Sequence, residues 1–500
     1  MIHSGGATDV SSSEAWRPRF HYTAERNWLN DPNGLVWFDG EYHLFYQYNP
    51  FGDQWGHMSW GHAVSTDLLH WHELPVAIAE DERASIFSGS VVVDAHNRSG
   101  LGDGKAAVLV AAYTACQRRA EGGQAQALAF SRDRGRTWAQ YAGNPVLDLG
   151  LRDFRDPKVF WHAGTSRWIM ATVLPDERCV AFFASADLKA WAELSRFSED
   201  HAGLGIWECP DVIELPVDAG AGRGMGSSAW MLKVDVFEGH PSRGSGARLF
   251  FGHFDGTRFI AEPSAHCWAD HGADFYAALS WAHLPSSPAR QVWIAWMNCH
   301  RYAKLLPTQP WRGAMSVPRE LSLRRDADGL RLLQQPVREL RALRGPRCDA
   351  APLSLARARH DWLPPALDKR ALEIEFDLDC GDSDECGIVL RAGAGGCGTR
   401  VGLDRRRGTV YIDRGRSGFV PEDLHFALRR EAPCASIAAG RVVHLHLLLD
   451  CSSVELFVDG GETVITEQIL PPADALDAPL YAEGGTAHFS ALHAHAIGCA

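Results

Sequence analysis

Residues 28–34 read Trp28-Leu29-Asn30-Asp31-Pro32-Asn33-Gly34 and run into Leu35-Val36-Trp37-Phe38, which has the composition of a β-strand. The carboxylate of Asp31 therefore stands at the entrance of a predicted strand. Pro32 fixes its own φ and biases Asp31 toward extended backbone, whereas Asn33 and Gly34 tolerate the positive φ of a tight turn. Taken alone, Asp-Pro-Asn-Gly is simply a good turn sequence.

The same arrangement recurs twice further along the chain. Asp156 lies in Arg155-Asp156-Pro157, ahead of Lys158-Val159-Phe160-Trp161. Glu208 lies in Glu208-Cys209-Pro210-Asp211, ahead of Val212-Ile213-Glu214-Leu215. Three acids at three equivalent strand entrances favour a common site over three unrelated turns.

Short strands dominate residues 19–340, with Gly, Asp and Asn between them and almost no helical periodicity. A weak repeat lies within this region: Ser65-Thr66-Asp67 precedes Trp71, Ser131-Arg132-Asp133 precedes Trp138, and Ser185-Ala186-Asp187 precedes Trp191. A repeat of roughly 55–65 residues is near the upper end for a propeller blade, so the region holds about five blades. The innermost strands of a propeller surround its axis, which would bring Asp31, Asp156 and Glu208 into one central pocket.

The composition divides the chain into four segments. Residues 1–18 are expected to form a disordered tail, and residues 19–340 a five-bladed β-propeller. Residues 341–368, rich in Arg, Leu, Ala and Pro, are expected to be a linker that is partly helical. Alternating strands such as 442–449 and 454–458 then predict a β-sandwich over 369–500. The predicted fold class is therefore all-β.

Charge and leader signals constrain the partners of the protein. The formal net charge of -13 argues against nucleic acid or an anionic membrane as a partner. No stretch approaches the ~20 apolar residues of a membrane span, and residues 1–15 lack the basic and apolar segments of a secretory signal. Twelve Cys without C-x-x-C spacing indicate reduced thiols. We expect a cytoplasmic monomer or homodimer, secreted or periplasmic if a leader was removed.

Three acids with an Arg beside one of them suit the cleavage of a glycosidic bond. One carboxylate attacks or stabilises the anomeric carbon, and one protonated acid assists the leaving group. We assign Asp31 as nucleophile and Glu208 as acid/base. Asp156 would stay ionised with the help of Arg155 and hold sugar hydroxyls. Residue types alone leave these roles open to permutation. No cofactor is expected, and no metal either, because the pairs His57/His62 and His70/His72 lack a third ligand.

The three acid motifs resemble the signature motifs of glycoside hydrolase family 32, the invertase, inulinase and levanase family. The likeness continues in order through Phe87-Ser88-Gly89-Ser90, Asp274-Phe275-Tyr276-Ala277 and Trp311-Arg312-Gly313-Ala314-Met315-Ser316, and into 452–460. The family implies a five-bladed propeller with a C-terminal sandwich, and a retaining double displacement through a fructosyl-enzyme. It implies Asp31 as nucleophile, Asp156 as transition-state stabiliser and Glu208 as acid/base. It also implies a fructose pocket formed by Trp28, Leu29, Asn30, Gln47, Trp55, Phe87, Ser88, Arg155, Tyr276 and Trp296.

Within that family, residues 49–62 and 153–161 resemble the exo-acting fructan hydrolases. We therefore expect an exo-β-fructosidase acting on levan or inulin and on sucrose. The alternatives are a sucrose-specialised invertase, a fructosyltransferase, and a non-catalytic sugar-binding propeller, which is disfavoured because all three acids are retained. One departure concerns Cys299-His300, where relatives tend to carry Asn and Trp. It removes an aromatic ring near the pocket rim and bears on leaving-group preference.

Overall fold

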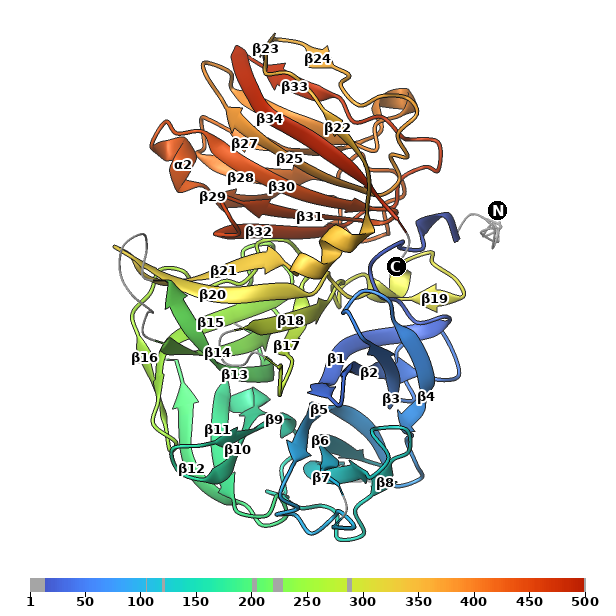
Figure 1. The fold of residues 1–500 in the computed structure, drawn as a ribbon, viewed down its shortest axis with the longest axis vertical. Helices are drawn as coiled ribbons and strands as arrows, with labels where there is room; N and C mark the ends of the chain where they lie inside the picture. Colours follow the sequence, from blue (N-terminus) through green and yellow to red (C-terminus); the bar gives the residue numbers. More distant parts are fainter. Residues whose placement is uncertain are drawn as a thin grey trace.

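The computed structural model describes residues 14–104, 106–118, 122–199, 205–218, 228–285 and 290–498. Two β-structured parts follow one another, a five-bladed β-propeller (lower half of Figure 1) and a β-sandwich (upper half). The predicted all-β fold class is confirmed. The helical segments are short: η1 (Glu14–Trp16), η2 (Pro175–Glu177), η3 (Ala303–Leu305), η4 (Arg338–Leu343), η5 (Ala394–Gly396) and α2 (Ala435–Ala438). No helix of the described residues is long and apolar enough to cross a membrane.

Each propeller blade contains four consecutive antiparallel strands, and a two-residue strand, β19, pairs beside the first blade. The first two blades contain β1 (Asn27–Phe38), β2 (Glu41–Asn49), β3 (Ser59–Ser65), β4 (His72–Ile78), β5 (Ala84–Asp94), β6 (Val108–Gln117), β7 (Gln124–Ser131) and β8 (Ala139–Gln140). The next two contain β9 (Arg155–His162), β10 (Arg167–Leu174), β11 (Cys179–Ser185), β12 (Ala192–Ser198), β13 (Trp207–Asp218), β14 (Ser228–Val236), β15 (Gly246–Phe254) and β16 (Phe259–Glu262). The last contains β17 (Tyr276–Ser280), β18 (Gln291–Trp296), β20 (Arg319–Asp326) and β21 (Gly329–Pro336); β19 (Trp311–Arg312) lies in the chain between β18 and β20.

The ring closes where the first blade meets the last. Asn27 and Trp28 of β1 pair in parallel with β19, and the backbone N–H of Trp37 donates to the carbonyl of Ala282 at 2.9 Å. One hydrophobic cluster lies between each two neighbouring blades; Trp60 and Tyr113, for example, belong to the cluster between the first two. The blades are thus held together by apolar packing, which fixes where the innermost strands stand around the axis.

The Ser-x-Asp repeat noted in the sequence forms the same turn in three blades. Asp67, Asp133 and Asp187 each accept a hydrogen bond from the Ser two residues earlier. The indole of the following Trp closes the turn by donating to the carbonyl three residues before it, as Trp71 does to Leu68. The repeat therefore marks the connection between the third and fourth strands of a blade.

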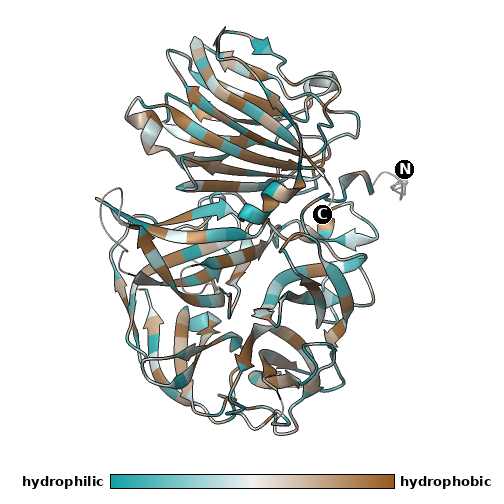
Figure 2. Ribbon diagram, in the orientation of Figure 1, coloured by the Kyte–Doolittle hydropathy of each residue, from teal (hydrophilic) through white to brown (hydrophobic). Residues whose placement is uncertain are grey.

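The sandwich has two antiparallel sheets around a single apolar core. One sheet contains β22 (Arg344–Asp349), β23 (Leu353–Ala356), β25 (Leu372–Asp379), β30 (Val443–Asp450), β31 (Ser453–Val458), β32 (Thr463–Gln468) and β34 (Thr486–Ile497). The other contains β24 (Arg359–His360), β26 (Glu385–Leu390), β27 (Thr399–Asp404), β28 (Thr409–Asp413), β29 (Arg430–Pro433) and β33 (Leu480–Glu483). Hydrophobic and hydrophilic residues alternate along these strands (Figure 2), as strands with one buried face require.

Two predicted segment boundaries differ from the structure. The predicted tail, residues 1–18, lies outside the described residues up to residue 13, but its last part is ordered, because Trp16 donates a hydrogen bond to Pro471 at 2.8 Å. The predicted linker, residues 341–368, contributes β22, β23 and β24, which pair with β34 and β33. Its Arg- and Pro-rich composition concealed strands that lie at the edges of both sheets.

A buried polar network joins the propeller to the sandwich. Asp450 accepts hydrogen bonds from the backbone of residues 19–21 and from His21 Nδ1 at 2.8 Å, and Glu455 lies 2.8 Å from His21 Nε2. Arg319 of β20 also binds Glu455. Burial alone would lower the pKa of His21, but the hydrogen bonds with both carboxylates outweigh it and raise the pKa to about 9. His21 is therefore a cation held between two anions at the interface.

Candidate active site

A cavity of about 420 Å³ opens at the centre of the propeller, where the innermost strands meet. Its volume falls within the roughly 300–1,000 Å³ of small-molecule sites. The lining residues are Trp28, Asn30, Asp31, Gln47, Trp55, Phe87, Ser88, Gln124, Asp153, Arg155, Asp156, Glu208, Phe237, His300 and Lys304. All three predicted acids are among them, although they are separated by up to 177 residues in the sequence.

Every innermost strand carries a β-bulge at the level of this cavity. In each, two residues oppose one on the second strand: Asn30-Asp31, Phe87-Ser88, Asp156-Pro157, Cys209-Pro210 and Ala277-Ala278. A bulge bends the strand and re-aims a side chain, and it tolerates proline because a ladder hydrogen bond is already lost. The predicted turns are therefore bulged strands: Asp31 is the fifth residue of β1, and Asp156 and Glu208 are the second residues of β9 and β13.

The bulges impose unusual backbone conformations on Asp156 and on the residue next to Glu208. Asp156 has φ 65° and Cys209, next to Glu208, has φ 45°, a region that non-glycine residues seldom occupy. Gly34 at φ 56° forms a second bulge in β1, and a Cβ there would lie 2.7 Å from Phe45. Local strain of this kind persists only where surrounding contacts enforce it.

Asp31 is held by hydrogen bonds to both of its carboxylate oxygens. Asn30 donates to Oδ1 at 3.0 Å, and Ser88 of the neighbouring blade donates to Oδ2 at 2.8 Å. Trp28 in turn donates from its indole to Asn30 at 2.6 Å. The thiol of Cys209 lies 3.6 Å from Asp31 Oδ2, which brings the bulge of β13 against the carboxylate of β1. These contacts fix one orientation of the Asp31 carboxylate.

Glu208 is oriented by two partners. Arg155 Nη2 lies 2.9 Å from Glu208 Oε1, and its Nε lies 3.2 Å from the same oxygen. The phenol of Tyr276 donates to Oε2. Arg155 is itself held by Asp153 at 2.9 Å and Gln124 at 3.2 Å. The Glu208 carboxyl is thus fixed at both oxygens.

Arg155 favours the ionised form of Asp156, as predicted, but it binds other groups more closely. Arg155 Nε lies 3.9 Å from Asp156 Oδ2, whereas its hydrogen bonds go to Glu208, Asp153 and Gln124. Asp156 accepts one hydrogen bond from the backbone N–H of Cys209 at 2.9 Å. Burial outweighs the opposing effect of Arg155 and, with the nearby Glu208, raises the pKa of Asp156 to about 7.

Three of the predicted pocket residues do not line the cavity. Leu29 is fully buried in the apolar core, and Trp296 is fully buried behind Trp28, with ring centroids 6.0 Å apart. Tyr276 reaches the site only through its hydrogen bond to Glu208. The sequence interpretation did not place Gln124, Asp153, Phe237 and Lys304 in the pocket; three of them belong to no motif, and Asp153 was noted only as the first residue of the stretch 153–161. Asp153 could have been found from its place two residues before Arg155, a common spacing for an ion pair along a chain.

A fourth carboxyl lies directly behind the site. Asp235 of β14 and Lys233, two residues earlier, form a fully buried ion pair. Lys233 Nζ also donates to the carbonyl of Cys209 at 2.6 Å. Burial raises the pKa of Asp235 to about 7 against the opposing effect of Lys233. No sequence motif drew attention to this pair.

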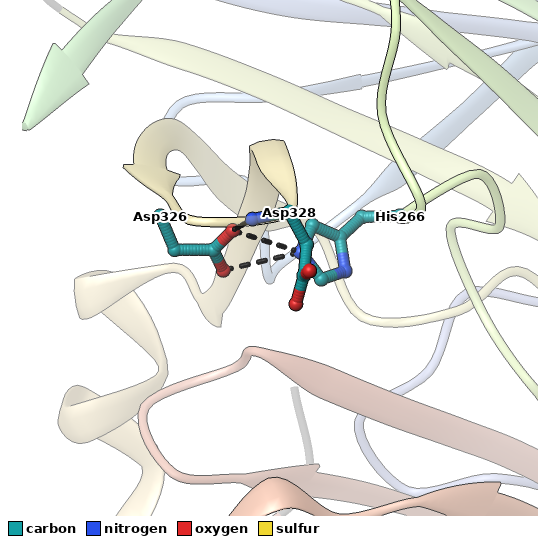
Figure 3. Close-up of side chains that lie close together, drawn as sticks. All are labelled: His266, Asp326 and Asp328. Carbon is teal, nitrogen blue, oxygen red and sulfur yellow. Dashed lines mark hydrogen bonds and ion pairs between the residues drawn. The ribbon is translucent and has the colours of Figure 1, made fainter.

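Two clusters of possible metal ligands lie away from the cavity. Asp326 at the end of β20 lies close to His266 and Asp328, with His266 Nε2 3.1 Å from Asp326 Oδ2 (Figure 3). Arg331 already occupies this cluster, since its Nη2 lies 3.2 Å from His266 Nε2 and its Nε 3.2 Å from Asp326. Arg344 does the same for the second cluster, Glu373, Glu375 and His446. With a guanidinium in each, neither cluster is assigned to a metal.

In a comparison with known proteins, both halves of the chain match models of one protein family. The model described as "Glycosyl hydrolases family 32 N-terminal domain" matches residues 21–336, and "Glycosyl hydrolases family 32 C terminal" matches residues 339–496. The levanase of Bacillus subtilis (strain 168) is 44% identical over 503 residues, covering 99% of this chain and 73% of that protein. The extracellular exo-inulinase of Aspergillus awamori is 36% identical over 511 residues, covering 95% and 93%.

Solved structures agree with these sequence matches. The crystal structure of exo-inulinase from Aspergillus awamori has a TM-score of 0.88 at 35% identity and covers 97% of this chain and 98% of its own. Fructofuranosidase from Schwanniomyces occidentalis, complexed with fructose, has a TM-score of 0.84 at 28% identity and covers 97% and 99%.

Proposed function

This chain belongs to glycosyl hydrolase family 32, and on that premise we propose that it is a retaining exo-β-fructosidase. It is a glycoside hydrolase acting on fructans, as its near full-length relatives include a levanase and exo-inulinases. We propose that it releases terminal β-D-fructofuranosyl residues from levan- or inulin-type fructans and from sucrose. The observation that carries this proposal is the convergence of three carboxylates on bulged strands in one cavity.

The first step forms the covalent intermediate. Asp31 attacks the anomeric carbon of the terminal fructose, and Glu208 donates a proton to the departing oxygen. The orientation of Asp31 supports this role, because Ser88 and Asn30 leave its carboxylate little rotational freedom. Glu208 is held by Arg155 at one carboxyl oxygen and by Tyr276 at the other.

The second step releases fructose. Glu208, now deprotonated, takes a proton from water, which attacks the same carbon and frees Asp31. Two inversions give net retention of configuration. Asp156, whose neighbours leave its carboxyl free to face the cavity, hydrogen-bonds fructose hydroxyls more tightly at the transition state than in the ground state.

A pocket closed at its inner end favours attack at a chain end. Asp156 is only 6% exposed, whereas Trp55 at the mouth is 57% exposed. One sugar ring therefore fits beside the acids, and the rest of the substrate lies toward solvent. This arrangement supports removal of terminal residues over internal cleavage.

The assembly and location of the protein stay predictions. Size-exclusion chromatography with light scattering distinguishes the expected monomer from the homodimer. A cytoplasmic location was expected from the sequence, while the exo-inulinase relatives carry the word extracellular in their names. Neither property alters the chemistry proposed for the cavity.

The activity is tested by following products from levan, inulin and sucrose in parallel by anion-exchange chromatography. We expect fructose as the only early product of both polymers. Short oligosaccharides would indicate internal cleavage, and longer products from sucrose would indicate fructosyl transfer. Added methanol should be captured as methyl β-D-fructofuranoside, and capture as the α-anomer would contradict retention.

Asp31→Asn is the decisive variant, because it keeps the shape of the nucleophile and removes its charge. Turnover should fall by at least about 10⁴-fold, the order of loss for a catalytic group. Asp176→Asn, at an exposed aspartate of η2, is the matched control and should retain parental activity. Asp31→Asn activity within tenfold of the parent would refute the assignment.

A further inference from the structure

Cys209, the residue after the acid Glu208, has no partner in the ladder between β13 and β14. Pairing stops after Glu208 and resumes at Asp211, so the carbonyl of Cys209 loses its ladder hydrogen bond. Cys209 is 3% exposed and has φ 45°, in the left-handed region. A buried carbonyl without a backbone partner is costly unless another donor replaces that partner.

Lys233 supplies the missing donor. Its ammonium is fully buried on the neighbouring strand β14 and donates to the carbonyl of Cys209 at 2.6 Å. A buried ammonium needs a counter-charge, and Asp235, also fully buried, provides it by accepting a hydrogen bond from Lys233 Nζ. Neither member of the pair is among the residues that line the catalytic cavity. Lys233 therefore meets the site through the carbonyl oxygen of Cys209.

Cys209 in turn is linked to all three acids of the site. Its backbone N–H donates to Asp156 Oδ2 at 2.9 Å, and its thiol donates to Asp31 Oδ2 at 3.6 Å. A peptide bond joins it to Glu208. A shift of Cys209 therefore disturbs three carboxyl groups at once. A left-handed backbone at a non-glycine residue persists only where surrounding contacts enforce it, and the bond from Lys233 is such a contact.

We propose that Lys233 and Asp235 are positioning residues for the cleavage of the fructosyl bond. Lys233 holds the Cys209 bulge in the conformation that presents the acids, and Asp235 stabilises the ammonium in the protein interior. The proposal rests on the proposed function and adds to it two residues that touch neither substrate nor the reacting atoms. A misplacement of about 1 Å can cost about a hundredfold in rate, which sets the size of the expected effect.

The test removes the hydrogen bond from Lys233 without leaving a buried charge. In Lys233→Met/Asp235→Leu, apolar side chains replace both charges, so the variant is expected to fold. We expect kcat on sucrose and on levan to fall about a hundredfold per folded molecule. KM should stay within about threefold of the parental value, because the acids act on the transition state more than on the bound substrate. Circular dichroism and urea unfolding give the folded fraction.

A second variant separates the hydrogen bond from the packing. Lys233→Gln/Asp235→Asn is uncharged, but its amide at position 233 can donate to the carbonyl of Cys209. Its kcat should exceed that of the apolar pair by at least about tenfold, the contribution typical of one hydrogen bond. If the apolar pair does not fold, Lys233→Met/Asp235→Asn replaces it, since this variant differs from Lys233→Gln/Asp235→Asn only at the donor.

Arg344→Met/Glu373→Leu is the matched control, because it replaces an ion pair within the sandwich in the same way and should leave kcat unchanged. A folded Lys233→Met/Asp235→Leu enzyme with kcat within about threefold of the parent overturns the proposal, since a purely structural pair affects only the free energy of unfolding. Equal kcat in the amide and apolar pairs overturns it too. Parental enzyme that cleaves neither sucrose nor levan refutes the proposed function instead, before any variant is compared.

Discussion

Glu208 and Asp235 stand directly opposite each other in the antiparallel ladder of β13 and β14. Two carboxyl groups thus leave neighbouring strands at the same height, one toward the cavity and one fully buried with Lys233. Like charges directly opposite in a ladder are destabilising. Lys233 compensates for this, and its bond to the Cys209 carbonyl supports the bulge that presents Glu208.

Removing one member of the Lys233–Asp235 pair should destabilise the protein strongly. Asp235→Leu leaves a buried ammonium without its anion, at a cost of roughly 3–5 kcal/mol. The double variant Lys233→Met/Asp235→Leu should recover most of that loss, because apolar residues replace both charges. Urea unfolding of the parent, the single and the double variant measures the difference. A double variant no more stable than Asp235→Leu would contradict the expectation.

Asp156 predicts how activity depends on pH. Burial raises the pKa of Asp156 to about 7, so its carboxyl becomes ionised only as pH rises through about 7. The proposed role of Asp156 needs the carboxylate, which accepts hydrogen bonds from fructose hydroxyls, so kcat/KM should rise as pH rises through about 7. Initial rates at substrate concentrations below KM, from pH 4 to 9, give the profile. A profile that stays flat to pH 9 would contradict this.

His21 predicts how stability depends on pH. Its pKa is raised from 6.5 to about 9 in the folded protein, so its contribution is fully present below pH 6.5 and is lost as pH rises through 9. The contribution is on the order of 3 kcal/mol. The stability difference between the parent and His21→Gln, from urea unfolding, should shrink between pH 6 and pH 9.5. A difference that is the same at both pH values would be the contrary result, and His96→Gln serves as the control.

Arg414 predicts a link between the sandwich and the cavity mouth. This fully buried residue binds Asp274 at 2.6 Å and the hydroxyl of Tyr302 at 2.8 Å, two residues after His300. Arg414→Met should cost roughly 3–5 kcal/mol, because Asp274 and Glu467 lose their cation. Urea unfolding of the parent and of the variant measures the difference, and equal stability would contradict the expectation.

Much of the fold was predictable because its signals are local. The acid-proline strands and the Ser-x-Asp turns ending in Trp each recur in three of the five blades, and a repeated local pattern survives any uncertainty about single elements. The same holds for Asp31, Asp156 and Glu208, whose sequence context marked them as equivalent.

Other features depend on contacts between distant segments and left no local signal. Arg155 precedes Asp156 but binds Glu208, a choice set by the way β9 and β13 meet at the axis. Trp296 resembled a pocket residue, yet Trp28 stands in front of it. The strands at 344–360 lie at sheet edges, where burial is too incomplete for clear alternation.

Each of the five bulges is flanked on both sides by residues that stay paired with the same neighbouring strand. The three acids are therefore positioned by pairing within their own blades and not by the segments at the rim of the cavity. Residues at the rim of the cavity, including 299–305, can be substituted, inserted or deleted while the three acids keep their positions. Substrate preference and bond cleavage can therefore change independently of each other, so a descendant of this protein could acquire a new substrate and keep the same catalytic acids.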